Sequence, residues 1–355
     1  MADAFIATVC ERVRECAATG TALRVRGGGS KDFYGEAPRG EPLEVGGYSG
    51  IVAYEPRELV LTVRAGTSLW EVEDALAAER QMLPFEPPRF ESGETRATIG
   101  GTVAAGMSGP RRPFAGAVRD FVLGTRIVNG RGEDLSFGGR VIKNVAGYDV
   151  SRLMAGAMGT LGVITEVSFK VLPRPAREAT LAFEMDEGAA IVEVNRWAGL
   201  PLPLSATAWE AGRLRVRLSG APSAVDAACL KMGGEDLGDA AGWWEDLREH
   251  RLEFFAGPRP LWRVSVPQTA APFDLARPML VEWGGGLRWM RGDVDADAMR
   301  GIVARAGGHA TLFRAAGERR AVFHPVAPAL MKIHRRLKQA FDPAGILNPG
   351  RLYDF

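Results

Sequence analysis

Apolar side chains recur every three or four residues over positions 3–18, and Thr19-Gly20 then provides a typical helix C-terminus, so the pattern predicts a helix there. Short β-branched runs follow, together with one amphipathic stretch that begins at Ser68, a residue type that caps helices. The predicted strands are 22–25, 50–54 and 59–64, and the predicted helix is 68–79. The opening of the chain is therefore predicted to be an α/β unit.

Residues 121–128 and 163–171 are β-branched and alternate in polarity, which is typical of an antiparallel sheet with one solvated face. Leu172-Pro173-Arg174-Pro175 then interrupts the chain, because proline cannot continue a helix and removes a ladder donor. We predict a domain boundary there, and an α+β domain of helices on an antiparallel sheet beyond it. Its predicted strands are 180–184, 206–209 and 214–218, and its predicted helices are 187–197 and 223–232.

Two further helical stretches each allow two interpretations. The helix around Trp243 and Trp244 could form an interface, but large aromatic side chains on one helical face favour a core. The last helix, 329–341, has one apolar and one basic face, and its length favours a surface helix with a solvated basic side over a membrane binder. The two faces are Leu330, Ile333, Leu337 and Phe341, and Lys332, Arg335, Arg336 and Lys338.

Composition narrows the class of protein. The 355 residues are 46% hydrophobic and 25% charged, as in a soluble globular protein with two or three cores. A net charge of +1 argues against nucleic-acid binding. Cys10, Cys16 and Cys229 form no C-x-x-C pair, so neither disulfides nor a cysteine metal or iron–sulfur site is expected. The chain shows no signal peptide and no apolar run of the roughly 18 residues needed to span a membrane, so we expect a cytoplasmic protein.

Glycine clusters are the strongest chemical signal. Residues 26–30, Arg-Gly-Gly-Gly-Ser, follow a predicted strand, where successive N–H groups can bind an anion and Ser30 and Lys31 add side-chain donors. Three glycines after a strand can also form a plain turn. No G-x-G-x-x-G opens a helix here and no Walker loop is present, which argues against a nicotinamide-binding Rossmann domain and a P-loop ATPase. Further clusters at Gly100-Gly101 and at Gly156, Gly159 and Gly162 favour backbone contacts with a flat, phosphate-bearing ligand.

Together these motifs resemble the flavin-binding domain of the vanillyl-alcohol-oxidase and p-cresol-methylhydroxylase (PCMH) superfamily. The motifs are residues 26–30, 97–101, 108–109, 141–149 and 159–166. The tail, 341–351, is similar to the end of the 2-hydroxy-acid oxidoreductase branch, and residues 143–154 are most similar to the E-subunit family of bacterial glycolate oxidases (glycolate dehydrogenases).

The resemblance implies an α+β fold: a two-subdomain PCMH-type FAD-binding domain over 1–175, a smaller α+β cap domain with an antiparallel sheet over 176–320, and a C-terminal segment, 321–355, whose helix returns to the FAD domain. By this resemblance, residues 27–30 hold the FAD pyrophosphate, 98–101 and a proline before them follow the ribityl chain and ring, 162–164 offer backbone groups, and Asn348 reaches the isoalloxazine. The full implied set is Arg26, Gly27, Gly28, Gly29, Ser30, Pro87, Pro88, Thr98, Ile99, Gly100, Gly101, Ser108, Gly109, Gly162, Val163, Ile164 and Asn348. The first glycine loop has no histidine for a covalent link, so non-covalent FAD is expected.

Two departures bear on catalysis. Relatives that oxidise D-lactate or glycolate commonly have an acid where this chain has Met158, and they carry a His-x-His metal motif that this chain lacks. None of its histidines is paired at ligand spacing, so no metal site is expected. His309 is the candidate general base, or else a polar residue that begins a strand. Arg259 and Arg263 are candidates to clamp a substrate carboxylate, or else exposed arginines.

Reduced FAD needs an electron acceptor, and the chain has neither cluster ligands nor a haem motif. We therefore expect an FAD-binding subunit of a glycolate oxidase complex that converts glycolate to glyoxylate. The expected partners are a second flavoprotein subunit and an iron–sulfur subunit, and any attachment to the inner membrane is through the complex. The alternatives are a self-sufficient FAD enzyme acting on a 2-hydroxy acid or alcohol, and a non-catalytic FAD-binding scaffold.

Overall fold

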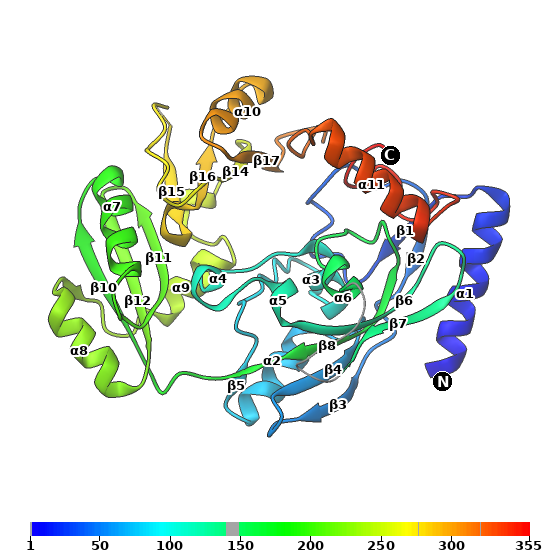
Figure 1. Cartoon of the computed structure of the whole chain (residues 1–355), viewed down its shortest axis with the longest axis horizontal. Coiled ribbons are helices and arrows are strands. Elements are labelled where there is room, and N and C mark those ends of the chain that lie inside the picture. The colour runs from blue at the N-terminus through cyan, green and yellow to red at the C-terminus, as the bar shows by residue number, and fades with distance from the viewer. Residues whose placement is uncertain (1, 140–148, 276, 320) are drawn as a thin grey trace. The chain divides into compact units, whose positions relative to one another are not determined.

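The computed structural model describes residues 2–139, 149–275, 277–319 and 321–355. They form two compact units, each assembled from separate stretches of chain (Figure 1). The first unit comprises Met1–Met107, Ala117–Pro173 and Pro325–Phe355, and the second comprises Ser108–Gly116 and Arg174–His324. Helices and largely antiparallel sheets occur in both units, which confirms the predicted α+β class.

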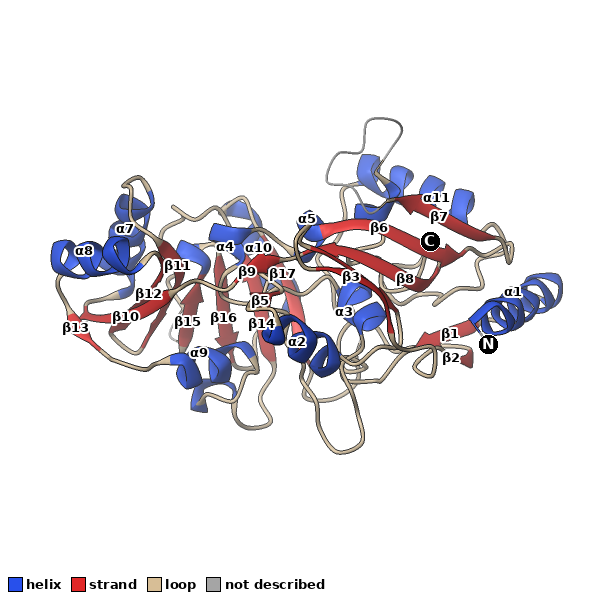
Figure 2. Ribbon diagram, turned by 90° about the horizontal axis from the view of Figure 1, so that it is seen from below, coloured by secondary structure: helices blue, strands red, loops and turns tan. Residues whose placement is uncertain are grey.

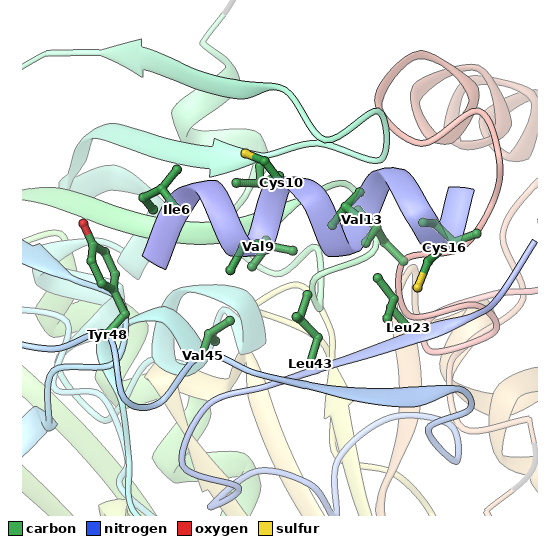
Figure 3. Packing of buried hydrophobic residues seen from close by; sticks show 13 residues of the cluster. Ile6, Val9, Cys10, Val13, Cys16, Leu23, Leu43, Val45 and Tyr48 are labelled. Atoms are coloured by element: carbon green, nitrogen blue, oxygen red, sulfur yellow. The ribbon is translucent and has the colours of Figure 1, made fainter. Parts of the chain in front are cut away.

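The predicted first helix is confirmed as α1 (Ala2–Thr19), which packs on the parallel pair β1 (Leu23–Arg26) and β2 (Glu41–Glu44). Figure 3 shows one face of α1 directed toward apolar side chains of β1, β2 and the turn after them. Its buried face is Ile6, Val9, Cys10, Val13 and Cys16, and the facing residues include Leu23, Leu43, Val45 and Tyr48. The helical spacing of these side chains is therefore the cause of the packing.

The largest sheet of the first unit has five antiparallel strands in the order β3-β4-β8-β6-β7. In β4 and β8 the hydroxyls of Thr62 and Ser168 pair at 2.8 Å on the face opposite Leu61 and Phe169. Both polar residues are buried, so this face is not solvated there as the sequence predicted. The strands are β3 (Ile51–Glu55), β4 (Val60–Arg64), β6 (Val122–Val128), β7 (Asp134–Gly138) and β8 (Val163–Lys170). The helices are α2 (Leu69–Ala78), α3 (Ile99–Ala105), α5 (Val118–Phe121) and α6 (Val150–Leu153). Ser68 caps α2 as predicted, by accepting a hydrogen bond from the N–H of Trp70.

The proline-containing break is part of a short ladder. The two-residue strand β9 (Leu172–Pro173) pairs with β5 (Gln81–Met82). Proline is tolerated there because a two-residue ladder needs few donors. The second unit continues directly from this ladder at Arg174.

The C-terminal helix α11 (Pro328–Phe341) corrects one expectation. Lys338, predicted to lie on the solvated basic face, is 7% exposed, whereas Leu330 and Ile333 of the predicted apolar face are 48% and 52% exposed. The prediction was wrong because the pattern within a helix does not show hydrogen-bond acceptors from other parts of the chain, and here such acceptors surround the Lys338 ammonium. After α11 the chain runs alongside β1, where Leu347 bridges Leu23.

The second unit is built on an eight-stranded sheet in which all pairs are antiparallel (Figure 2). Its strands are β10 (Arg177–Glu184), β11 (Leu204–Glu210), β12 (Arg213–Gly220), β13 (Glu235–Asp236), β14 (Leu261–Ser265), β15 (Met279–Glu282), β16 (Leu287–Arg291) and β17 (His309–Arg314). Its helices are α4 (Arg112–Ala115), α7 (Glu187–Ala198), α8 (Pro222–Met232), α9 (Ala241–Arg248) and α10 (Ala296–Arg305), with 3₁₀ turns at Glu253–Phe255 and Trp283–Gly285.

Helices α7 and α8 pack their apolar residues on one face of this sheet, against side chains such as Leu181. Trp244 of α9 is 3% exposed and donates its indole N–H to the hydroxyl of Thr180 at 2.9 Å. Because Thr180 is adjacent to Leu181 in β10, α9 covers the opposite face. Trp244 is therefore a core residue, as predicted. No helix in the described ranges is long and apolar enough to cross a membrane.

Candidate functional site

An open cavity of about 500 Å³, including solvent at its mouth, lies within the first unit beside the glycine loop that follows β1. Segments far apart in sequence form its walls: the loop, one side of α3 from its cap Thr98 to its last residue Ala105, the Met158 turn and the C-terminal segment. The lining residues that the sequence predicted are Arg26, Gly27, Gly28, Gly29, Ser30, Thr98, Gly101 and Asn348. Those that it did not include in the cofactor set are Val25, Lys31, Asp32, Arg96, Ala104, Ala105, Met158 and Arg351.

Glycine is required in the loop partly because other backbone passes against it. A Cβ on Gly28 would lie 2.1 Å from the carbonyl oxygen of Arg96, whose own N–H donates to the Gly28 carbonyl at 2.8 Å. Gly29 has φ +78°, and a Cβ there would lie 2.3 Å from Nη2 of Arg26. That guanidinium needs the space because it reaches across the loop to Asp32, with Nε 2.7 Å from Oδ2.

The loop presents unused backbone donors to the cavity. No hydrogen bond formed among the described residues uses the N–H groups of Gly27, Gly28 or Gly29. Three successive peptide donors beside an open cavity form a concave site suited to an anion. These donors would suit the phosphate groups of a ligand.

The charges around the cavity are mostly positive. Arg26, Lys31, Arg96 and Arg351 line it, against one carboxylate, Asp32. Asp32 raises the pKa of Arg26 through their hydrogen bond and charge. The Lys31 ammonium donates to Ser30 Oγ and to the Arg89 carbonyl, each at 3.2 Å, and the Arg351 guanidinium donates to backbone carbonyls of residues 31, 32 and 36. An anionic ligand is therefore favoured here over a cationic one.

Asn348 fastens two walls of the cavity together. Its side-chain oxygen accepts a hydrogen bond from the N–H of Val25 at 2.7 Å, and its amide nitrogen donates to the Met158 carbonyl at 2.6 Å. A Cβ on Gly159 would lie 2.7 Å from that nitrogen, which explains the glycine after Met158. Asn348 thus holds β1 and the Met158 turn in place, while its predicted contact with the flavin ring stays a prediction.

Lys338 and Asp342 anchor the segment that carries Asn348. The Lys338 ammonium lies 2.6 Å from Asp342 Oδ2 and 2.8 Å from the carbonyl oxygens of Thr160 and Leu347. Burial lowers the pKa of Lys338, and the Asp342 charge opposes that shift. Asp342 also accepts hydrogen bonds from the N–H groups of residues 346 and 347. The pair therefore fixes the chain immediately before Asn348.

The remaining predicted cofactor residues of the first unit lie outside the cavity lining. The N–H groups of Ile99 and Gly100 donate to the carbonyls of Thr67 and Ala65, and Val163 is fully buried in the core under α1. The set is Pro87, Pro88, Ile99, Gly100, Gly162, Val163 and Ile164. Their roles stay predictions, and residues 141–148 of the family motif lie outside the described ranges.

Ser108 and Gly109 belong to the second unit, where the Gly109 carbonyl accepts a hydrogen bond from the indole of Trp283 at 3.1 Å. Their assignment to the cofactor also stays a prediction. The place of this nine-residue stretch in the second unit was not predicted, because no proline- or glycine-rich boundary like that at residues 172–175 sets it apart from the first unit on both sides.

The candidate base lies in the second unit. His309 is opposite Ser265 in the ladder of β14 and β17, and Arg263 of β14 lies 5.2 Å from the ring centroid of Trp283. Desolvation, then Arg263 and His324, lower the pKa of His309, so the imidazole is neutral near pH 7 and able to accept a proton. The catalytic role of His309 and the carboxylate clamp by Arg263 stay predictions, and Arg259 is exposed. Within the described ranges no three metal-ligating side chains gather to hold an ion.

Comparison with known proteins identifies related sequences. The family described as FAD binding domain matches residues 5–138, and the family described as FAD linked oxidases, C-terminal domain, matches residues 316–352. Glycolate oxidase subunit GlcE of Escherichia coli (strain K12) is 47% identical over 343 residues, which cover 97% of this chain and 96% of that protein. Glycolate oxidase subunit GlcD of Bacillus subtilis (strain 168) is 33% identical over 131 residues, 37% of this chain and 27% of that protein.

Among solved structures, p-cresol methylhydroxylase with substrate bound matches with a TM-score of 0.72 at 16% identity, over 98% of this chain and 87% of that one. At this identity the match shows the fold alone, and it confirms the predicted PCMH-type architecture.

Proposed function

The chain belongs to the glycolate oxidase subunit GlcE family, and from that premise we propose that it is the FAD-binding subunit of a glycolate oxidase complex. In this proposal the complex oxidises glycolate to glyoxylate, and the electrons pass to a partner iron–sulfur subunit. The observation that carries the assignment to FAD is the set of unused N–H groups at Gly27, Gly28 and Gly29 beside a positively charged cavity.

The residues fit the cofactor. The three glycine N–H groups suit the diphosphate, Ser30 and Lys31 add side-chain donors, and the absence of Cβ atoms leaves room for the backbone to approach. When bound, FAD accepts a hydride from a carbon that bears a hydroxyl group and returns the electrons to an acceptor. The chain's contribution is to bind the diphosphate through the glycine loop, which has no side chains in the way, and to hold β1 and the Met158 turn together through Asn348.

We propose that the FAD is held without a covalent bond. The cavity-lining residues within the described ranges include no histidine, cysteine or tyrosine, the side chains that offer a nucleophile to the flavin ring. Lys31 and Ser30 are hydrogen-bonded to each other at 3.2 Å and suit an anion rather than the ring.

The proposed partners are a GlcD-type second flavoprotein subunit and an iron–sulfur subunit. The match to GlcD of Bacillus subtilis covers 27% of that protein and 37% of this chain, consistent with two subunits that share a cofactor-binding region and differ elsewhere. The chain does not supply the cluster itself, because it has three cysteines, of which Cys10 and Cys16 belong to the buried face of α1 and Cys229 lies in the second unit. We propose a cytoplasmic location, with attachment to the inner membrane through the complex.

A second candidate is a self-sufficient flavoenzyme, and one observation favours it: the neutral imidazole of His309 lies near the Arg263 charge on the β14–β17 ladder. Mixing the purified chain with glycolate under anaerobic conditions separates the two. If the chain is a subunit, we expect the absorbance bands of oxidised flavin to persist until the partner subunits are added. Rapid bleaching by glycolate in the chain alone would support the self-sufficient enzyme instead. A flavin that never bleaches during turnover of the full complex would support a scaffold.

A further inference from the structure

Arg96 is held firmly at the edge of the glycine loop. Its N–H donates to the Gly28 carbonyl at 2.8 Å, and it forms a parallel bridge with Gly29. The chain before it is fixed by Glu91, whose carboxylate accepts hydrogen bonds from the Ala97 N–H and the Trp70 indole, both at 2.8 Å. The backbone therefore delivers the Arg96 side chain to one defined place on the cavity wall.

The guanidinium of Arg96 has no acidic partner among the residues that the structure describes, unlike that of Arg26, which also lines the cavity. Arg26 is ion-paired with Asp32, and Arg351 is 7% exposed and donates to backbone carbonyls. Arg96 is exposed, donates only to the carbonyls of Gly93 and Thr95 in its own loop, at 3.2 and 3.0 Å, and forms no ion pair with a carboxylate of the described chain. Its charge is thus unneutralised and adjacent to the unused glycine N–H groups.

We propose that Arg96 is a binding residue for the diphosphate of the cofactor. This inference rests on the proposed function, because it takes the anion in the cavity to be that of FAD. A guanidinium offers two parallel donors to phosphate oxygens, so Arg96 supplies charge where the peptide N–H groups supply only dipoles. Since its present acceptors are carbonyls of its own short loop, little is lost when it turns toward the ligand.

The test compares FAD binding by the deflavinated full-length chain and its variants. We expect Arg96→Ala to weaken FAD binding roughly 10- to 100-fold, the effect of losing one charge-assisted contact. Arg96→Lys should recover part of the loss, because it restores the charge without the paired donors. Arg57→Ala is the matched control: Arg57 is exposed, lies in the turn between β3 and β4 of the same unit and is absent from the cavity lining, so its FAD affinity should match the wild type.

The dependence of FAD affinity on KCl distinguishes a charge contact from a structural one. The wild-type affinity should fall with added KCl, and Arg96→Ala should show a shallower dependence because one screened contact is gone. If Arg96→Ala binds FAD as tightly as the wild type, the inference is overturned while the proposed function stands. The same holds if Arg96→Ala binds more weakly but keeps the wild-type KCl dependence and Arg96→Lys recovers nothing. Failure of the folded wild-type chain to bind FAD would overturn the proposed function, and the inference with it.

Discussion

The buried pair of Lys338 and Asp342 gives the sharpest test of how the cavity is held together. Replacing Lys338 with methionine nearly keeps the length of the side chain but leaves the Asp342 carboxylate without its positive partner. Both residues are buried, with Lys338 7% and Asp342 1% exposed. The substitution also strips donors from the carbonyls of Thr160 and Leu347, both 2.8 Å from Nζ. Breaking such a buried pair typically costs about 3–5 kcal/mol, since the remaining charge is left without its partner.

Asp342 keeps two other donors, the N–H groups of Ile346 and Leu347 at 3.2 and 2.8 Å, so we expect the lower end of that range, about 3 kcal/mol. Urea unfolding followed by circular dichroism measures the change in the free energy of unfolding. Lys332→Met is the matched control, because Lys332 lies on the exposed side of the same helix and should cost no more than about 0.5 kcal/mol.

The same variant should also loosen FAD, because Leu347 precedes Asn348, which joins β1 to the Met158 turn. Adding Asp342→Asn to Lys338→Met should recover part of the stability, since no unpaired charge would remain. If Lys338→Met and Lys332→Met unfold at the same urea concentration, the buried pair does not hold this segment and the reasoning is wrong.

Two other substitutions test the second unit and the cavity charge. His250 is partly buried, with its ring against those of Phe255 and Trp289, and desolvation lowers its pKa well below 6.5. The folded state therefore stays neutral while the unfolded state takes up a proton, and stability should fall by about 1.4 kcal/mol from about pH 7.5 to about pH 5.5. Urea unfolding of His250→Phe should show a smaller fall over the same pH range. An equal fall in both proteins would contradict this. Ala105 lines the cavity, so Ala105→Glu should weaken FAD binding about tenfold by adding a negative charge near the diphosphate, whereas Ala105→Gln, which has a side chain of the same size as Glu, should not. Equal affinities of the two variants, measured by flavin fluorescence titration, would place the diphosphate elsewhere.

The elements of the fold were largely predictable, because their causes are local. The spacing of apolar residues in α1 and the cap at Ser68 each lie within one element, and the structure has them as predicted. Lys338 was wrongly predicted to be solvated because its burial depends on Thr160 and Asp342, and neither residue lies within the helix whose pattern was used.

The site was partly predictable for the same reason. The glycine loop and Asn348 stand out as motifs, and both line the cavity. Arg96 and Arg351 were missed because an isolated arginine in a sequence looks like a surface residue. Gly28 has a structural role as well as its proposed role in binding, because its missing Cβ makes room for the Arg96 carbonyl. A substitution at Gly28 would therefore disturb the fold together with the cofactor site.

Above all, we propose that this chain binds FAD without a covalent bond, and an absorption spectrum of the purified protein before and after acid precipitation is the test. We expect the bands of an oxidised flavin in the native protein and their complete transfer to the supernatant when the protein is precipitated. A folded chain that is colourless and takes up no added FAD would contradict the claim, and a flavin that stays with the precipitate would contradict its non-covalent part.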